Sequence, residues 1–116
     1  MIYVENNSKD VYFNFALEYW LITEKRLAED QVFLFWRTEP TLMVGKYQNP
    51  LEEINLSYAK EHGIHIVRRM SGGGTIYTDT GGWQFTFITR NNAAQISFRE
   101  YISPVVDTLR GMGVDA

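Results

Sequence analysis

Apolar side chains recur at helical spacing near the start of the chain. Phe13, Leu17, Trp20 and Leu21 are three and four residues apart, and Asp10 precedes them as a capping residue. This pattern predicts a helix from residue 10 to about residue 29, with those apolar side chains facing the core.

Two apolar runs follow and predict two neighbouring strands. Residues 32–36 are almost continuously apolar, which is typical of a strand covered on both faces, and residues 41–45 form a second run after Pro40. Asn49 and Pro50 then have the residue types of a helix start. We expect that helix to end at residue 63, which is a glycine.

Alternation of apolar and polar residues returns in residues 64–69. Successive side chains of such a strand face opposite sides, so Arg68 and Arg69 should point in opposite directions. Residues 75–78 and 83–88 also have strand composition, and we expect them to pair as a hairpin across the glycine-containing turn between them.

The last segment predicts a helix and a change of structure after it. Ser97 and Glu100 have the spacing of a capping box, which opens a helix to about Gly111, and Pro104 should kink it or mark its first turn. Residues 111–116 have the pattern of a helix stop turning into a new strand. The elements predict an α+β fold, and we expect 1–116 to be part of a larger domain.

Composition narrows the class of protein. The chain has 116 residues, of which 45% are hydrophobic, and suits one folded domain. A net charge of −3 gives no general attraction to nucleic acid or to an anionic membrane, so we expect neither as a partner. The chain contains no cysteine, signal peptide or apolar stretch of about 18 residues, which favours a soluble, cytoplasmic protein.

Three consecutive glycines are the most informative feature of the chain. Gly72, Gly73 and Gly74 can expose backbone amides to a ligand, and Arg68 or Arg69 can bind phosphate or carboxylate oxygens. The segment lacks the residues of a Walker A loop or a dinucleotide fingerprint. We interpret it as a phosphate-facing loop, and the alternative is a simple β-turn whose arginines pair with Glu or Asp.

Other candidate groups carry weaker signals. Asp79 could bind Mg²⁺ or a hydroxyl group, although an Asp that opens a turn more often makes a local bond to the backbone. Ser71 has no base in view and is expected to donate to a ligand oxygen. His62 and His65 do not form a helical pair of ligands, and we assign no metal site. Trp36 could line a binding pocket, although tryptophans in such elements are mainly core.

The sequence from Arg68 to Tyr77 resembles the Arg-Arg-x-Ser-Gly-Gly-Gly-Ala-Val-Tyr signature of the lipoate-protein ligase A family, within the biotin/lipoate protein ligase superfamily. The resemblance extends to residues 12–18, to residues 34–50 with their Trp, Pro and Gly-x-x-Gln-Asn positions, and to residues 85–88, so it covers nearly the whole chain in order. It implies a class II aminoacyl-tRNA synthetase/biotin ligase-like fold, with a mixed, mainly antiparallel sheet and flanking helices.

The resemblance also implies a two-step ligase. Lipoate is first joined to AMP at the expense of ATP, with Mg²⁺ expected to accompany it. The lipoyl group then passes to a lysine of an acceptor domain in 2-oxoacid dehydrogenases or of the glycine-cleavage H protein. Carried over by position, Arg69, Gly74, Thr75, Ile76 and Tyr77 hold ATP and the adenylate. The supporting residues are Trp36 at the acyl-adenylate pocket and Arg68, Ser71, Gly72, Gly73 and Asp79 around the loop.

Two departures from the family pattern shape the hypothesis. Thr78 and Gly82 stand where many members have His and Asn. The family's catalytic lysine would lie beyond Ala116, so we expect no catalytic residue in this chain, inactivity of the chain alone and a requirement for a carboxy-terminal half. Alternatives are an octanoyltransferase of the same superfamily, which uses no ATP, and a non-catalytic binding or regulatory module.

Overall fold

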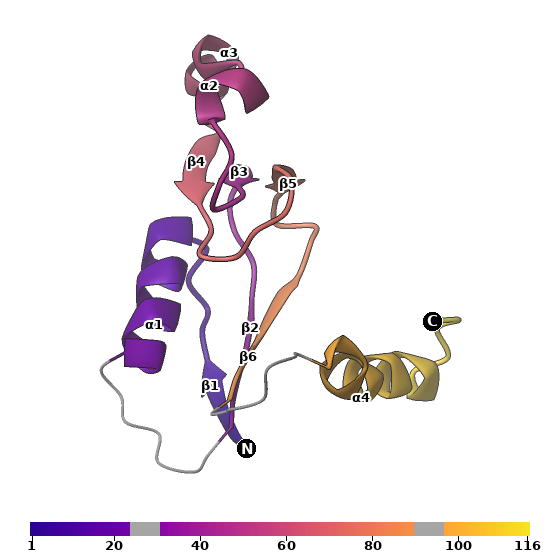
Figure 1. Ribbon diagram of the computed structural model, residues 1–116. Helices are drawn as coiled ribbons and strands as arrows, with labels where there is room; N and C mark the ends of the chain where they lie inside the picture. Colours follow the sequence, from indigo (N-terminus) through magenta and orange to yellow (C-terminus); the bar gives the residue numbers. More distant parts are fainter. Residues whose placement is uncertain (24–30, 90–96) are drawn as a thin grey trace.

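The computed structural model describes residues 1–23, 31–89 and 97–116. These residues form two three-stranded sheets and four helices (Figure 1). Helix α1 lies along the sheets, α2 and α3 lie together at one end of the molecule, and α4 stands on the side opposite α1. The α+β class predicted from the sequence is confirmed.

The first sheet is centred on β2 (Val32–Trp36), which pairs in parallel with β1 (Ile2–Glu5) and antiparallel with β6 (Gln84–Ile88). The sequence analysis did not predict β1, although its alternate residues Ile2 and Val4 are apolar and pack against the core. β2 buries one face completely and leaves the other half-buried, so it is less enclosed than its apolar run predicts.

The second sheet is centred on β3 (Thr41–Val44). It pairs in parallel with β4 (His65–Arg68) and antiparallel with β5 (Ile76–Thr78). Two predictions of strand pairing were therefore wrong. β2 and β3 lie in different sheets, and β5 and β6 do not form a hairpin. The short turns after β2 and after β5 instead carry the chain between the sheets, which lets β6 pair with β2 along its full length of five residues.

Helix α1 (Val11–Thr23) begins where Asp10 predicts. The Asp10 carboxylate accepts hydrogen bonds from the amides of Tyr12 and Phe13 at 2.8 and 3.2 Å. The predicted core face was partly wrong, because Phe13 and Trp20 are about half exposed, at 52% and 49%. The buried face is rotated and contains Val11, Asn14, Glu18 and Leu21. Residues 24–29 of the predicted helix lie outside the described residues.

The buried polar side chains of α1 are paired, which makes their burial tolerable. The Asn14 amide donates to the carbonyls of Ser8 and Arg37, and its oxygen accepts from Asn6 at 2.8 Å. The main apolar core lies between α1 and the two sheets and consists of Val11, Leu21, Val32, Leu34, Trp36, Met43 and Val67.

The single helix predicted after Asn49 is two short helices, α2 (Pro50–Glu53) and α3 (Leu56–Glu61). Asn49 caps the first by accepting from the Leu51 amide at 3.2 Å, as its position predicts. Asn55 interrupts the run because its side chain caps a new helix, accepting from the Tyr58 amide at 3.0 Å. Ile54, between the helices, is buried and joins a second small core.

Helix α4 (Phe98–Gly111) has no buried residue and contains Pro104 in its interior. The predicted capping box was wrong, since the Ser97 side chain makes no capping hydrogen bond. The helix ends as a Schellman motif at Gly113, with φ of 87° and a bond from the Val114 amide to the Leu109 carbonyl at 3.0 Å. Residues 114–116 form no strand, contrary to expectation.

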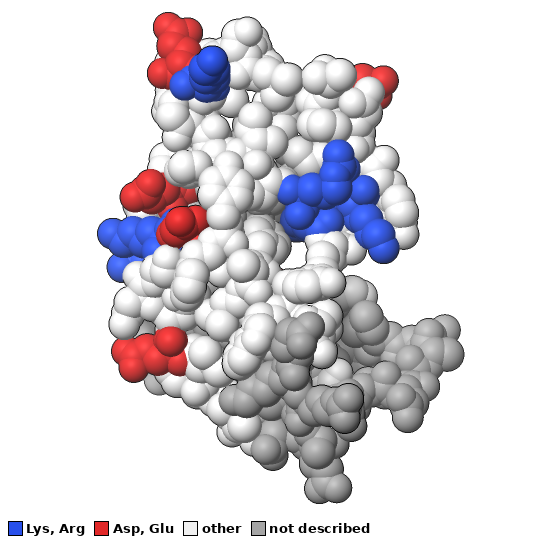
Figure 2. Space-filling view, turned by 90° about the vertical axis from the view of Figure 1, so that its left-hand side faces the viewer, with Lys and Arg blue, Asp and Glu red and all other residues white. Residues whose placement is uncertain are grey.

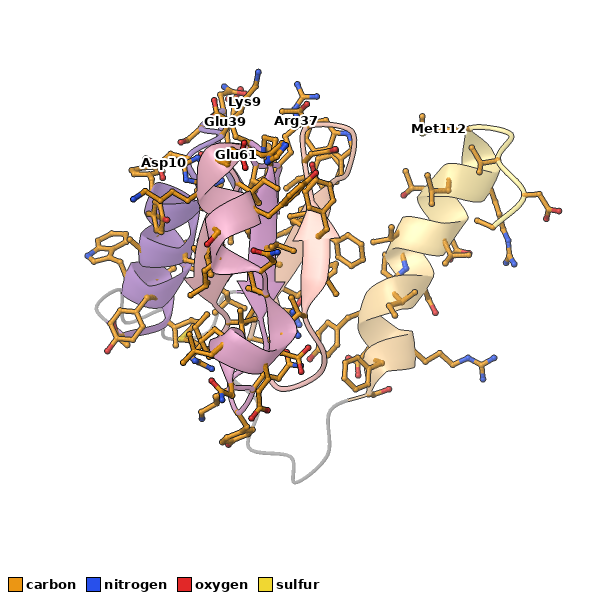
Figure 3. The ribbon with its side chains drawn as sticks, turned by 90° about the horizontal axis from the view of Figure 1, so that it is seen from above. Lys9, Asp10, Arg37, Glu39, Glu61 and Met112 are labelled. Carbon is orange, nitrogen blue, oxygen red and sulfur yellow. The ribbon has the colours of Figure 1, made fainter. Side chains whose placement is uncertain are left out.

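An apolar groove of about 600 Å³ lies between α4 and the outer face of the first sheet. Aromatic side chains of the sheet line it, together with Val105, Leu109 and Met112 of α4. Figure 3 shows α4 running beside the sheet, with Met112 near its far end. In the parts of the chain that the structure describes, no helix has the length and hydropathy needed to cross a membrane.

Candidate functional site

The glycine-rich loop (residues 69–75) lies against a second loop, the turn of residues 45–48 that follows β3. The two loops are joined by main-chain hydrogen bonds, from the Lys46 amide to the Ser71 carbonyl at 2.9 Å and from the Arg69 amide to the Val44 carbonyl at 2.8 Å. A Cβ atom on Gly45 would lie only 1.9 Å from the Gly73 carbonyl oxygen. The loops therefore touch backbone to backbone at Gly45.

Arg69 holds the glycine-rich loop in shape. One terminal nitrogen of its guanidinium donates to the carbonyls of Gly72 and Gly74, both at 2.9 Å, and the other donates to the Met43 carbonyl at 2.9 Å. Gly73 between them has a φ of 97°, which only glycine adopts readily. The loop thus curls around the guanidinium with the carbonyls of Gly72 and Gly74 turned toward it, while the Gly73 carbonyl faces Gly45.

Arg68 holds the neighbouring turn in the same way. One guanidinium nitrogen of Arg68 donates to the carbonyls of Gly45, Lys46 and Gln48 at 3.0, 3.1 and 2.8 Å. The two adjacent arginines therefore serve different loops, and β4 ends at Arg68, so the strand alternation that predicted opposite directions does not extend to Arg69. Among the described residues neither arginine forms a salt bridge with a carboxylate, so the ion pairing that a simple β-turn predicts is not found there.

The outer surface of the glycine-rich loop offers hydrogen-bond donors. Ser71, Gly72, Gly73 and Gly74 are exposed, and their amides donate to no residue that the structure describes. A Cβ atom on Gly72 or Gly74 would meet nothing within 4 Å. Because the carbonyls of Gly72 and Gly74 face Arg69, the arrangement can bind an anion through amides at a surface that a side chain would obstruct.

Positive charge collects at the same place. The hydrogen bonds of the two loops bring Lys46, Arg68 and Arg69 together. Figure 2 shows a compact patch of basic side chains on this face of the molecule, surrounded by uncharged atoms. Such a patch attracts anions locally even though the net charge of the whole chain is −3.

Gln48 joins the two loops, and the sequence reasoning did not single it out. Its side-chain oxygen accepts from the Gly45 amide and from the Thr75 hydroxyl, each at 2.9 Å. The signal available in the sequence was only its place in the Gly-x-x-Gln-Asn segment. The structure adds that this residue touches both ends of the site.

The segment after the glycines runs directly into β5. Ile76 and Tyr77 are about half exposed, whereas Thr78 is buried. The Thr78 hydroxyl accepts from the side-chain amide of Gln84 at 2.9 Å. The Asp79 carboxylate accepts from the Gly81 amide at 2.8 Å, which is the local turn bond weighed as its alternative role. Arg69 and residues 71–77 thus belong to one continuous segment, with Asp79 in the turn that follows it.

Trp36, which the resemblance places at the acyl-adenylate pocket, lies in the main core. It is 3% exposed, and its indole nitrogen donates to the Glu18 carboxylate and to the Thr86 hydroxyl, each at 3.2 Å. The Thr86 hydroxyl also bonds to Glu18. Burial raises the pKa of Glu18 above its ordinary value, and the hydrogen bonds from Thr86 and Trp36 partly offset that rise.

The other two tryptophans are less buried than the sequence predicts. Trp20 and Trp83 are each 49% exposed. Trp83 stacks on Phe35 with ring centroids 4.2 Å apart, and the Arg37 guanidinium lies over it at 4.6 Å. Figure 3 shows Arg37 at the edge of the molecule that also carries Lys9 and Glu39.

The described residues offer no evident metal site. Within residues 1–23, 31–89 and 97–116, no three His, Asp or Glu side chains converge. Asp79, the one carboxylate considered for Mg²⁺, already uses one oxygen in its turn. These residues therefore do not fit a Mg²⁺ site by themselves.

Comparison with known sequences identifies relatives that match most of the chain. Residues 10–116 match the model of the lipoyl protein ligase A/B catalytic domain. The chain is 42% identical to lipoate–protein ligase 1 of Staphylococcus aureus over 113 residues, which are 96% of this chain and 34% of that protein. It is 41% identical to the human mitochondrial lipoyl amidotransferase LIPT1 over 86 residues, 74% of this chain and 23% of that protein.

Solved structures show the same architecture. The protein Ta0514 of T. acidophilum with bound lipoic acid superposes with a TM-score of 0.84 at 27% identity, over 99% of this chain and 48% of that one. A lipoate-protein ligase A bound with ATP gives a TM-score of 0.81 at 26% identity, over 99% and 46% of the two chains.

A third structure concerns an archaeal lipoylation system, a bi-partite lipoate protein ligase and its E2 lipoyl domain from Thermoplasma acidophilum. It gives a TM-score of 0.82 at 27% identity, over 100% of this chain and 45% of that one. The chain spans about a third of the Staphylococcus relative and less than half of these solved chains. The chain belongs to the lipoyl protein ligase A/B catalytic domain family.

Proposed function

We propose that this chain supplies the adenylate-binding loop of a lipoate-protein ligase. In this proposal ATP and lipoate are joined as lipoyl-AMP, and the lipoyl group then passes to a lysine of a lipoyl-acceptor domain. The observation that carries the proposal is the exposed glycine-rich loop, whose carbonyls are held by Arg69 while its amides remain available.

The chemistry of the first step suits such a loop. A carboxylate oxygen of lipoate attacks the α-phosphorus of ATP, the bond to pyrophosphate breaks, and negative charge builds on the phosphoryl oxygens. Fixed amide donors stabilise charge where it develops, because they need not reorganise during the reaction. The backbone from Gly74 to Tyr77 holds the nucleotide in this scheme, Ser71 to Gly73 shape the loop, and Arg68 and Arg69 provide positive charge.

The second step transfers the acyl group. The lysine amine attacks the acyl carbon of lipoyl-AMP, AMP leaves with the bonding electrons, and the amine loses a proton. No described residue is assigned as the base for that proton. In this proposal Mg²⁺ accompanies ATP into the site, because the described residues do not form a site for the ion by themselves.

The relatives support the substrates and the partner class. Lipoic acid and ATP are bound in two structures of similar fold, and a third pairs a bi-partite ligase with a lipoyl domain. We extend these to this chain, with acceptor domains of 2-oxoacid dehydrogenases or the H protein as partners in the cytoplasm. Because the chain spans about a third of the Staphylococcus ligase, we propose that ligation requires a carboxy-terminal part carrying the catalytic lysine.

A second candidate is lipoyl transfer without ATP. The similarity to human LIPT1, which is named a lipoyl amidotransferase, favours it over a purely structural role. The two functions differ in their use of nucleotide. Release of pyrophosphate that depends on lipoate supports the ligase, whereas acyl transfer from a lipoylated donor without pyrophosphate release supports the transferase.

Arg69→Ala, with Arg110→Ala on α4 as the matched control, tests the loop assignment. We would measure binding of a non-hydrolysable lipoyl-AMP analogue by isothermal titration. Loss of the three carbonyl contacts of Arg69 should weaken binding about tenfold or more, whereas Arg110→Ala should leave it unchanged. Equal affinity of the wild-type chain and Arg69→Ala would refute the assignment.

A further inference from the structure

We infer that Gln48 is the positioning residue of the glycine-rich loop, and this inference rests on the proposed function. Its side-chain oxygen fixes both ends of the site with one atom, at Gly45 and at Thr75. Neither of the two arginines reaches Thr75 through a hydrogen bond of the described residues. Gln48 therefore controls the point at which the loop enters β5.

The assignment of the side-chain atoms follows from the partners. The Gly45 amide can only donate, so the Gln48 atom 2.9 Å away must be the oxygen. The Thr75 hydroxyl then donates its proton to the same oxygen. The side-chain nitrogen of Gln48 therefore lies on the other side of the group, where it donates to no described residue.

Gln48 is itself held firmly, as a positioning residue must be. The backbone carbonyl of Gln48 accepts from Arg68 at 2.8 Å, and its backbone amide donates to the Gly45 carbonyl at 3.1 Å. The side chain is only partly exposed. Arg68 thus acts on the glycine-rich loop indirectly, by fixing the turn from which the Gln48 side chain extends.

One consequence concerns Thr75, which the proposed function places at the nucleotide. Its hydroxyl proton is engaged by Gln48, so Thr75 contributes a backbone group rather than a hydroxyl donor to the ligand. Three glycines in a row have unusually wide backbone freedom. Arg69 restrains the middle of this segment and Gln48 restrains its far end, which makes the two restraints complementary.

A double-mutant cycle tests the inference. Gln48→Met keeps the length of the side chain without the acceptor, and Thr75→Val keeps the shape without the hydroxyl. We expect Gln48→Met to weaken binding of the lipoyl-AMP analogue about tenfold and Thr75→Val about fivefold. The double variant should bind like Gln48→Met, because both changes remove one shared contact. Thr75→Ser, which restores the hydroxyl, should recover wild-type affinity.

The readout must separate positioning from general stability and from the proposed function. Amide NMR signals of Gly72, Gly73 and Gly74, recorded on the 116-residue chain without ligand, should shift in both single variants and return in Thr75→Ser. Unshifted glycine signals with affinity within twofold of wild type, or effects that multiply in the double variant, would overturn the inference. If the wild type binds no analogue but its glycine signals respond as expected, the positioning role stands and the proposed function fails. Thermal unfolding identifies any variant that does not fold, and Thr75→Val then decides alone.

Discussion

Replacing Gly45 by alanine is the sharpest perturbation that the contact between the two loops allows. The added Cβ would lie 1.9 Å from the Gly73 carbonyl oxygen and 3.1 Å from the side-chain oxygen of Gln48. The first distance is about 1.5 Å inside an ordinary contact, and the obstructing atom belongs to the backbone and cannot rotate away. The glycine-rich loop must therefore move as a unit.

The size of the effect follows from what this movement breaks. Overpacking of a well-packed site costs about 1–3 kcal/mol, and a shift of Gly73 also disturbs the bonds of Gly72 and Gly74 to Arg69. We expect Gly45→Ala to lower the free energy of unfolding by about 1–3 kcal/mol. Its affinity for the lipoyl-AMP analogue should fall about tenfold or more, because the amides no longer occupy their places.

Gly74→Ala is the matched control, because it adds the same methyl group to the glycine-rich loop outside the contact between Gly45 and Gly73. Nothing lies within 4 Å of its added Cβ, and its φ is not positive. The free energy of unfolding should change by no more than about 0.5 kcal/mol. Affinity for the analogue should still fall if the outer surface of the loop faces the ligand.

Denaturant unfolding followed by tryptophan fluorescence gives the stability, and isothermal titration gives the affinity. The two variants should therefore separate, with Gly45→Ala losing stability and affinity and Gly74→Ala losing affinity alone. Equal stability of Gly45→Ala and Gly74→Ala would show that the loops are not in contact at Gly45. Unchanged affinity in both would show that the loop does not bind the adenylate.

Three further predictions concern the core and the end of α4. Burial raises the pKa of Glu18, so the native state holds the proton of this carboxyl to higher pH than the unfolded state does, and the free energy of unfolding should fall as pH rises from the unfolded pKa through the folded one. Glu18→Gln should flatten this part of the pH profile measured by urea unfolding, and an unchanged profile would contradict the assignment. Trp36→Phe removes the donor to Glu18 and Thr86 and should cost about 1–3 kcal/mol by the same measurement, whereas a change below about 0.5 kcal/mol would mean that the bonds contribute little. Gly113→Ala places a side chain at φ of 87° and should destabilise the end of α4 by about 1 kcal/mol, while Gly111→Ala inside the helix should stabilise it by up to about 1 kcal/mol. Circular dichroism measures the helicity of both variants, and higher helicity in Gly113→Ala than in Gly111→Ala would refute the Schellman assignment.

Local sequence signals predicted the positions of most elements. Helix ends are marked by Asp10, Asn49 and Gly113. The first two side chains accept hydrogen bonds from nearby backbone amides, and Gly113 adopts the positive φ that ends a helix. Asn55 shows the limit of such reasoning. A second capping residue inside an apolar pattern splits one helix into two, and the pattern alone does not say which cap prevails.

Long-range pairing was harder to predict, since a short turn looks the same whether it closes a hairpin or joins two sheets. The buried face of α1 was misjudged for a related reason. Hydrophobic periodicity places Phe13 and Trp20 inward, but paired polar groups let Glu18 occupy the core through partners on distant strands. The sequence alone pointed to the glycine-rich loop and its arginine as a candidate site. The role of Gln48 became visible only in the folded chain, because its hydrogen-bond partners are 3 and 27 residues away in the sequence.

The carbonyls gathered around Arg69 have a kinetic consequence. Arg69 orders the loop through three hydrogen bonds within the protein, so we expect most of the entropy of ordering the three glycines to be lost during folding and little of it when a nucleotide binds. Association should then proceed in a single phase whose rate rises linearly with nucleotide concentration, without the plateau of a slow rearrangement.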